Sequence, residues 1–173
     1  MGVTRYRCIA ADPPWMERGG GKIKRGADRH YALLKPAQIV TVMRETGQFT
    51  GDSPCHLWMW CTDNHLTHGL EVMRAVGFRY VRLLVWHKEG NIGLGQYLRG
   101  AHEVCLFGVR GRLPAESRAQ PSAFAARRGR HSEKPARAYE IIEAVSPGPR
   151  LELFARAPRP GWSTQGLELQ EGV

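Results

Sequence analysis

The chain of 173 residues is long enough for one domain with a hydrophobic core and too short for two comfortable ones. Hydrophobic residues make up 42% and charged residues 24%, which excludes wholesale disorder, and no apolar run approaches the roughly 20 residues that a membrane-spanning helix needs. The net charge of +9 favours an acidic polymer as partner, although a GC-rich genome would also enrich arginine, which outnumbers lysine 20 to 5.

Short apolar runs and helical patterns alternate from the start of the chain. Residues 6–11 predict a short strand that ends at Asp12, and residues 35–44 predict a helix with Pro36 in its first turn. The nearly continuous apolar run over residues 56–60 is typical of a strand that is covered on both faces.

A second helix and two further strands follow. Residues 62–64 are candidate helix caps, and Gly77 is expected to end the helix that they begin. Residues 80–86 and 104–109 are predicted to be strands. The apolar positions that recur at helical spacing are Leu66, Leu70, Met73 and Val76.

The composition changes after Gly111. Residues 110–131 are rich in Arg, Ala, Gly and Pro, and they predict a long, mobile, basic loop. Ser132 is expected to cap a helix that ends near residues 146–148, and residues 150–156 predict a last strand before a tail rich in Gly and Pro.

The order β-α-β-α-β-β-α-β predicts an α/β fold, a three-layer sandwich with a mostly parallel sheet. We expect a single domain over residues 1–173, with basic mobile loops at about residues 16–30 and 110–131. In an open sheet of this kind, function sits at the carboxyl ends of the strands.

Four cysteines are scattered along the chain, and three of them lie in apolar, strand-like runs. Buried free thiols of this kind are typical of a reducing compartment. The first residues also lack the layout of a secretory signal. We therefore expect a cytoplasmic protein, prokaryotic or phage-encoded, with free thiols at Cys8, Cys55, Cys61 and Cys105.

The sequence Asp12-Pro13-Pro14-Trp15 stands at the end of the first predicted strand. The two prolines fix the backbone and remove two donors, which leaves carbonyl oxygens as the backbone hydrogen-bonding groups. The Asp12 carboxylate and the Pro13 carbonyl can each accept one hydrogen from an exocyclic amine, which frees the nitrogen lone pair for attack, and Trp15 offers a stacking face. The alternative is a Pro-rich turn with a core tryptophan, but an aspartate directly before the prolines favours a receptor for a planar group that bears an amine.

This tetrad and its surroundings resemble the MT-A70 family of N6-adenine methyltransferases over nearly the whole chain. Each matching segment is weak alone, but the segments follow one another in the family's order. They are residues 12–15, His30-Tyr31, residues 57–62, Trp86-His87-Lys88, residues 102–111, residues 131–135, residues 146–156 and the closing element from Gly161 to Leu169.

The resemblance implies a Rossmann-like methyltransferase fold, S-adenosyl-L-methionine as the cofactor, and residues 12–15 as the catalytic tetrad. It implies that the methionine end of the cofactor meets Asp12 and the loop near His102. Arg156 and the closing element, with Gly166 and Glu168, would hold the ribose or the adenine. The chain has no glycine-rich cofactor fingerprint, and Leu167-Glu168 stand where eukaryotic members carry Asn-Gln.

On the substrate side, the resemblance and the charge pattern point to two groups of residues. Trp15, Lys88 and the His30-Tyr31 pair would face the base. A basic group would either grip phosphates or keep a long loop soluble, and residues 19–29 would form either a basic lid or a linker. The basic group is Arg127, Arg128, Arg130 and His131.

The implied reaction is methylation of the exocyclic N6 amine of adenine in a polynucleotide, with DNA favoured over RNA and the target base out of its stack. The reaction requires neither a metal nor a covalent intermediate. One alternative is a non-catalytic nucleic-acid-binding subunit of a methyltransferase heterodimer; another is a small-molecule amine methyltransferase, which leaves the net charge without a purpose. A homodimer or heterodimer stays open, and no membrane partner is expected.

Two other patterns are weaker. Cys61, His65 and His68 suggest a zinc site, but no fourth ligand stands at a recognisable spacing, so a packed or solvated histidine pair is favoured. Residues 19–22 imitate half of a phosphate-binding loop, but they lack the upstream glycine and the following Ser or Thr.

Overall fold

The computed structural model describes residues 4–16, 33–49, 51, 53–90, 97–129 and 133–166. The three α-helices have ten residues each, and within the described ranges no helix has the length and apolar composition to cross a membrane. In chain order the elements are β1 (Cys8–Ala11), α1 (Pro36–Glu45), β2 (Cys55–Cys61), a short 3-10 turn η2 (Asp63–His65), α2 (Leu66–Ala75), β3 (Arg79–Glu89), β4 (His102–Arg110), β5 (Ala123–Arg127), α3 (Ala136–Val145), β6 (Arg150–Leu153) and β7 (Trp162–Gln165).

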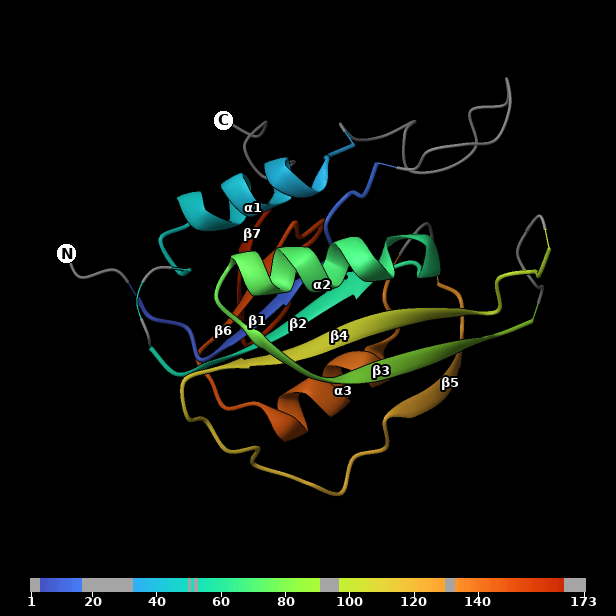
Figure 1. Ribbon diagram of the computed structural model, residues 1–173. Helices are drawn as coiled ribbons and strands as arrows, with labels where there is room; N and C mark the ends of the chain where they lie inside the picture. The colour runs from blue at the N-terminus through green and yellow to red at the C-terminus, as the bar shows by residue number, and fades with distance from the viewer. Residues whose placement is uncertain are drawn as a thin grey trace.

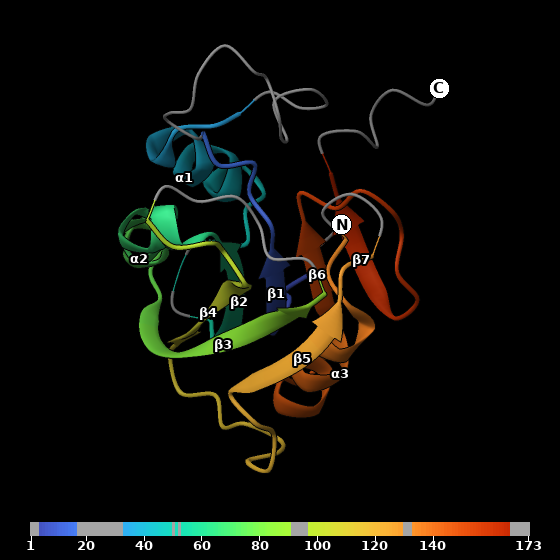
Figure 2. The ribbon, with the colours of Figure 1, turned by 90° about the vertical axis from the view of Figure 1, so that its right-hand side faces the viewer.

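Seven strands form one sheet in the order β5-β3-β4-β2-β1-β6-β7. The strand β1 pairs in parallel with β2 and β6, β6 with β7, and β3 with β5, whereas β4 runs antiparallel to both β2 and β3. The helices α1 and α2 cover one face of the sheet and α3 covers the other (Figure 1, Figure 2). The predicted three-layer sandwich with a mostly parallel, Rossmann-like sheet is confirmed.

This strand direction brings several chain segments to one edge of the sheet, which we call the carboxyl edge. The strands β1, β2, β3, β5 and β6 end there. Because β4 is antiparallel to its neighbours, it begins there instead, at His102. The carboxyl edge is therefore the place where the ends of most strands and the start of β4 meet.

Two strands lie where the sequence predicts none. Residues 123–127 form β5, so the prediction of a loop over residues 110–131 is wrong for this segment. The segment carries no β-branched residue, and its strand conformation depends on pairing with residues 85–89 of β3. In the same way, β7 forms in the predicted tail by pairing with β6.

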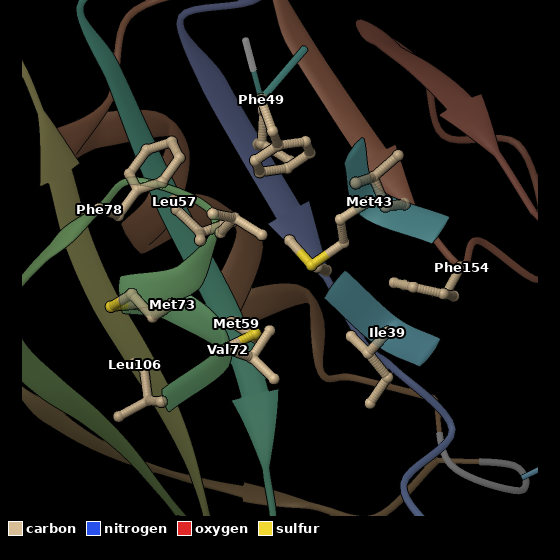
Figure 3. Packing of buried hydrophobic residues seen from close by; sticks show 14 of the residues in the cluster. Ile39, Met43, Phe49, Leu57, Met59, Val72, Met73, Phe78, Leu106 and Phe154 are labelled. Carbon is tan, nitrogen blue, oxygen red and sulfur yellow. The ribbon is translucent and has the colours of Figure 1, made fainter. Parts of the chain in front are cut away.

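The predicted strand over residues 150–156 ends early, at Leu153, because Phe154 adopts a φ of 60°. A left-handed backbone costs a bulky residue roughly 1–2 kcal/mol. The Phe154 side chain is buried in the core beside α1, so packing holds the residue in this conformation (Figure 3). The turn leads into Ala155, whose N–H donates to the carbonyl of Gln165 at 3.2 Å.

Two hydrophobic layers lie on the two faces of the sheet. Leu57 and Met59 of β2 belong to the layer beneath α1 and α2, shown in Figure 3, while Trp58 and Trp60 belong to the layer beneath α3. This alternation confirms that the apolar run of β2 is covered on both faces. All four cysteines are free and buried, as predicted, and burial raises the pKa of Cys8, Cys55 and Cys61 to about 12.

A buried polar network ties the end of α3 to β2. The Ser146 hydroxyl lies 2.9 Å from Nδ1 of His56 and accepts a hydrogen bond of 2.9 Å from the indole N–H of Trp58. The other ring nitrogen of His56 lies 2.9 Å from the carbonyl of Leu113. The network satisfies these buried polar groups and fixes α3 against the sheet.

Candidate active site

Four charged side chains meet at the carboxyl edge. Asp12 directly follows β1, Lys88 lies near the end of β3, and Glu103 is the second residue of β4. The fourth, Lys134, stands two residues before α3. We call these four residues the charged cluster.

Lys134 joins the two carboxylates of the charged cluster. Its Nζ lies 2.8 Å from Oδ2 of Asp12 and 3.2 Å from Oε2 of Glu103, whose other oxygen accepts from Lys88. The Lys134 side chain is 7% exposed, and its ammonium lies 5.2 Å from the ring centre of Trp60. Positive and negative groups therefore alternate, and each buried charge has a partner of opposite sign.

The ion pairs shift the pKa values of Glu103 and Lys134 more strongly than burial does. Burial by itself raises the pKa of Glu103, but the neighbouring Lys134 and Lys88 bring that pKa below its ordinary value. Burial by itself lowers the pKa of Lys134, but Asp12 and Glu103 bring that pKa above its ordinary value. Glu103 and Lys134 are therefore both charged at neutral pH.

In the Asp12-Pro13-Pro14-Trp15 tetrad, each proline carbonyl already accepts one backbone hydrogen bond. The Trp15 N–H donates to the carbonyl of Pro13 at 2.9 Å, and the Leu34 N–H donates to the carbonyl of Pro14 at 2.8 Å. A carbonyl oxygen carries two lone pairs, so each of these acceptors keeps capacity for a second donor. The two predicted carbonyl acceptors are therefore present, and each can accept one more hydrogen bond.

Trp15 is part of the core. Its side chain is 7% exposed, its indole N–H donates to the carbonyl of Trp60 at 2.9 Å, and its ring stacks on His65 at a centroid distance of 5.5 Å. The prediction that Trp15 offers an open stacking face is therefore wrong, because a ring buried to this extent has no face free for a base. Trp15 instead matches the alternative hypothesis of a core tryptophan that follows a Pro-rich turn.

The sequence profile of the MT-A70 family matches residues 6–168, which include the whole charged cluster. The chain belongs to the MT-A70 family. This confirms the resemblance drawn from the tetrad and the segments that follow it.

Named relatives of the family align along the chain. Type II methyltransferase M.MunI from Mycoplasma sp is 28% identical over 188 residues, which cover 96% of this chain and 79% of that protein. The human N(6)-adenosine-methyltransferase catalytic subunit METTL3 is 27% identical over 178 residues, and a putative MT-A70-like protein from Medicago truncatula is 25% identical over 177 residues. These two alignments cover 96% of this chain but only 29% and 27% of those proteins, so the chain spans less than a third of their length.

The sequence predicts no role for Lys134, although Lys134 lies in a segment that matches the family. The composition offers one signal. The chain carries five lysines against twenty arginines, and two of the five, Lys88 and Lys134, lie in the charged cluster. A lysine in an arginine-rich chain is a candidate for a position that needs a compact ammonium.

His102, predicted near the methionine end of the cofactor, lies at the carboxyl edge as the first residue of β4. Its Nε2 lies 3.0 Å from Oδ1 of Asp63, and both side chains are about half exposed, at 42% and 54%. The contact joins the start of β4 to the turn after β2. His102 is therefore beside the charged cluster in the fold, and its contact to a cofactor stays a prediction.

Arg127 and Arg128 lie at the same edge. Arg127 is the last residue of β5 and pairs in register with Glu89, next to Lys88 on β3. Both arginines are exposed. The strand β5 therefore brings a basic rim beside the charged cluster, although the sequence predicts no strand there.

The opposite side of the carboxyl edge carries a second polar group around Glu152 of β6. Its carboxylate accepts from the hydroxyl of Tyr139 and lies 3.8 Å from Nε of Arg159, whose guanidinium packs 3.3 Å from the Tyr139 ring centre. Burial raises the pKa of Glu152, and the Tyr139 hydrogen bond and Arg159 oppose this effect only in part. Arg156, the predicted cofactor residue, is half-buried in the same β6–β7 connection. Sequence reasoning missed Glu152 and Arg159.

Gly166 follows β7 and packs against the β6 end. A Cβ added to Gly166 would lie 2.0 Å from the carbonyl oxygen of Ala155, a backbone atom that cannot move aside cheaply. We expect Gly166→Ala to lower the free energy of unfolding by about 1–3 kcal/mol, as overpacking does. Urea unfolding measures this loss. Gly100→Ala is the control, because nothing lies within 4 Å of its added Cβ, and equal midpoints for the two variants would contradict the packing role.

Five predicted site residues lie outside the described residues. They are His30, Tyr31, Arg130, His131 and Glu168. The predicted basic lid over residues 19–29 also lies there. Within the described ranges, no group of three or more His, Cys, Asp and Glu side chains is arranged to hold a metal ion.

Proposed function

We propose that this chain transfers a methyl group from S-adenosyl-L-methionine to the exocyclic N6 amine of adenine in a polynucleotide, with DNA favoured over RNA. The observation that carries the proposal is the Asp12 carboxylate at the end of β1, held by buried Lys134 beside two proline carbonyls with spare acceptor capacity. Membership of the MT-A70 family and the names of its members support the choice of reaction. The alignment of most of M.MunI, a type II methyltransferase, supports DNA.

The donor set at the carboxyl edge fits this cofactor. The methionine end of S-adenosyl-L-methionine carries an ammonium, and the Asp12 carboxylate, whose side chain is 25% exposed, is the complementary group of the charged cluster. Lys134 is only 7% exposed, and its part is to hold Asp12 in place. Glu152 is a carboxylate beside the end of β6, and its chemistry fits a ribose diol. The cofactor supplies a methyl group activated on a sulfonium. We assign its methionine end to Asp12 with the His102 side of the edge, and its nucleoside end to Arg156, Gly166 and Glu168.

Asp12 acts on the acceptor amine in this proposal. Lys134 contacts Oδ2 of Asp12, so we assign Oδ1 to accept one hydrogen of the amine. The Pro13 carbonyl accepts the other hydrogen through its second lone pair. Two acceptors draw the nitrogen lone pair out of conjugation with the ring and hold it in line with the methyl group, so the catalytic contribution is mainly one of position. Oδ1 is also placed to take the proton that the methylated amine releases.

Trp15 has a supporting role in this proposal. Its buried ring and its hydrogen bond to the Trp60 carbonyl anchor the backbone that carries the two acceptors. The contacts to the base therefore fall to Lys88 and, beyond the described residues, to His30 and Tyr31.

Incubation of the protein with methyl-labelled cofactor and adenine-containing DNA or RNA oligonucleotides, followed by nucleoside mass spectrometry, tests the proposal. We expect N6-methyladenine in DNA, and less of it in RNA. Label in RNA alone would overturn the substrate preference. Absence of labelled adenine in both, with the cofactor bound, would favour the non-catalytic subunit.

The exposed arginines at the end of β5 give a separate prediction. If Arg127 and Arg128 contact phosphates, replacing both by Gln lowers the slope of log affinity against log salt by about 0.7–0.9 for each lost contact. Titration of a fluorescent oligonucleotide at several salt concentrations measures this slope. The matched control replaces Arg79 and Arg112, which are exposed at the opposite edge of the sheet, and should leave the slope unchanged. Equal slopes in both variants would mean that Arg127 and Arg128 only keep the segment soluble.

A further inference from the structure

His65 is buried in an exposed stretch of chain. It is the last residue of η2, where Asp63 and Asn64 are exposed, yet its own side chain is only 5% exposed. Its neighbour His68, on α2, is exposed. The two histidines that sequence reasoning considered as a weak zinc pair therefore differ in environment, and the ring of His65 points into the protein.

Each functional part of the His65 ring has a partner. Its Nε2 lies 3.1 Å from the carbonyl oxygen of Met16, and its Nδ1 lies 2.8 Å from the hydroxyl of Thr62. Because a carbonyl can only accept, Nε2 carries a hydrogen in this contact, and in the neutral ring Nδ1 then accepts from the hydroxyl. The face of the ring stacks on Trp15 with an interplanar angle of 22°.

These contacts anchor the far end of the catalytic tetrad. The near end, Asp12, is fixed by its position directly after β1. The far end is joined to the neighbouring strand β2 through the Trp15 indole, which donates to the Trp60 carbonyl, and to the turn after β2 through His65. Both proline carbonyls lie between these two anchors, so a shift of Met16 or Trp15 moves the acceptors.

We propose that His65 is a positioning residue for methyl transfer. It holds Trp15 by stacking and Met16 by a hydrogen bond, and it thereby sets where the Pro13 carbonyl and the Asp12 carboxylate stand relative to the amine. This role rests on the proposed function, but the anchoring itself is a property of the chain without substrate. It also explains why a polar ring is buried beside Trp15.

Two substitutions separate the parts of this role. His65→Phe keeps a ring against Trp15 and removes the hydrogen bond to Met16. His65→Gln can still donate to the Met16 carbonyl and removes the ring. We expect His65→Phe to keep less than about a tenth of the turnover, with the KM for an adenine oligonucleotide within about threefold, and His65→Gln to keep at least about a third. His68→Phe, on the exposed neighbour, should match the unchanged protein.

A second measurement does not depend on activity. Hydrogen exchange followed by mass spectrometry reports the amides of Trp15 and Leu34, which donate to the two proline carbonyls. In His65→Phe, these amides should exchange at least about tenfold faster, while β2 keeps its protection. If His65→Phe does not fold, Thr62→Val removes the hydroxyl that holds Nδ1 and should speed the same amides.

The two readouts distinguish the possible failures. Unchanged exchange at Trp15 and Leu34 in a folded His65→Phe would overturn the positioning role, as would a loss of turnover in His65→Phe that only follows the loss of folded protein. If the unchanged chain transfers no methyl group, the proposed function fails, and faster exchange at the two amides would still establish His65 as the anchor.

Discussion

We expect Asp12→Ala to abolish methyl transfer while the affinity for S-adenosyl-L-methionine stays within about tenfold of that of the unchanged chain. Asp12 acts mainly on the amine of the acceptor, and that interaction is strongest in the transition state. Its contact to the methionine end of the cofactor is one of several in the proposed site, so its loss lowers the affinity by no more than this factor. The fold should survive, because Lys134 keeps its contact to Glu103 when Asp12 is removed. Turnover with a labelled cofactor and calorimetric titration of the cofactor measure the two quantities.

Two further variants make this result specific. Asp12→Asn should be nearly as inactive, because its amide can present a donor where an acceptor is needed. Glu140→Ala removes an exposed carboxylate of α3 that contacts no residue of the proposed site, and should retain most of the turnover. Retention of more than about a tenth of the turnover in Asp12→Ala would contradict the assignment of Asp12.

The second large effect concerns Lys134. We expect Lys134→Met to lower the free energy of unfolding by about 3–5 kcal/mol, because Asp12 loses the cation that contacts it and Glu103 keeps only Lys88. Asp12 and Glu103 then face each other as like charges in a site where their side chains are only 25% and 18% exposed. Urea unfolding measures the loss. Arg137→Met is the control, because its pair with Glu140 lies on the surface and such pairs contribute about 0–1 kcal/mol.

The pH dependence of stability provides a check on the same residue. The folded-state pKa of Glu103 is depressed, so its contribution is present above its unfolded value near 4.5 and is lost as the pH falls through the folded value. The folded-state pKa of Lys134 is raised, so its contribution is present below 10.5 and is lost as the pH rises above that value. The free energy of unfolding should fall less between roughly pH 5 and pH 3 in Lys134→Met than in the unchanged chain. An unchanged acid dependence would show that Lys134 does not hold Glu103 in its charged form.

The sequence was sufficient to predict the parts of the fold that depend on local pattern. The three helices, the two-sided burial of β2 and the position of Asp12 after the first strand follow from periodicity and prolines. The predicted N-caps are wrong: α3 begins at Ala136 with Pro135 as its N-cap, and Thr62 makes no capping hydrogen bond through its side chain. The strands β5 and β7 do not, because both are short segments without a clear alternation of apolar and polar residues, and they become strands by pairing with β3 and β6. The early end of β6 depends on core packing of Phe154, which no local pattern reveals.

In the candidate site, too, local sequence predicts some features, and others depend on contacts between distant segments. The tetrad and its chemistry could be predicted because Asp12 and the prolines are adjacent in sequence. The partnership of Lys134 with Asp12 and Glu103 could not, because it depends on the antiparallel direction of β4 and on the place where α3 begins. The burial of Trp15 could not be predicted for a related reason: its partners, Trp60 and His65, come from the next strand and the turn after it.

The charged cluster is electrically neutral as a set, since it contains two carboxylates and two ammonium groups. The net charge of +9 is therefore carried by other residues. A neutral group of paired charges produces little field beyond its own contacts, while exposed arginines act over about one Debye length, roughly 8 Å at physiological ionic strength. Under the proposed function, rising salt then releases nucleic acid before it disturbs the cofactor. A salt gradient on a column should therefore yield protein that is free of polynucleotide and still able to retain its methyl donor.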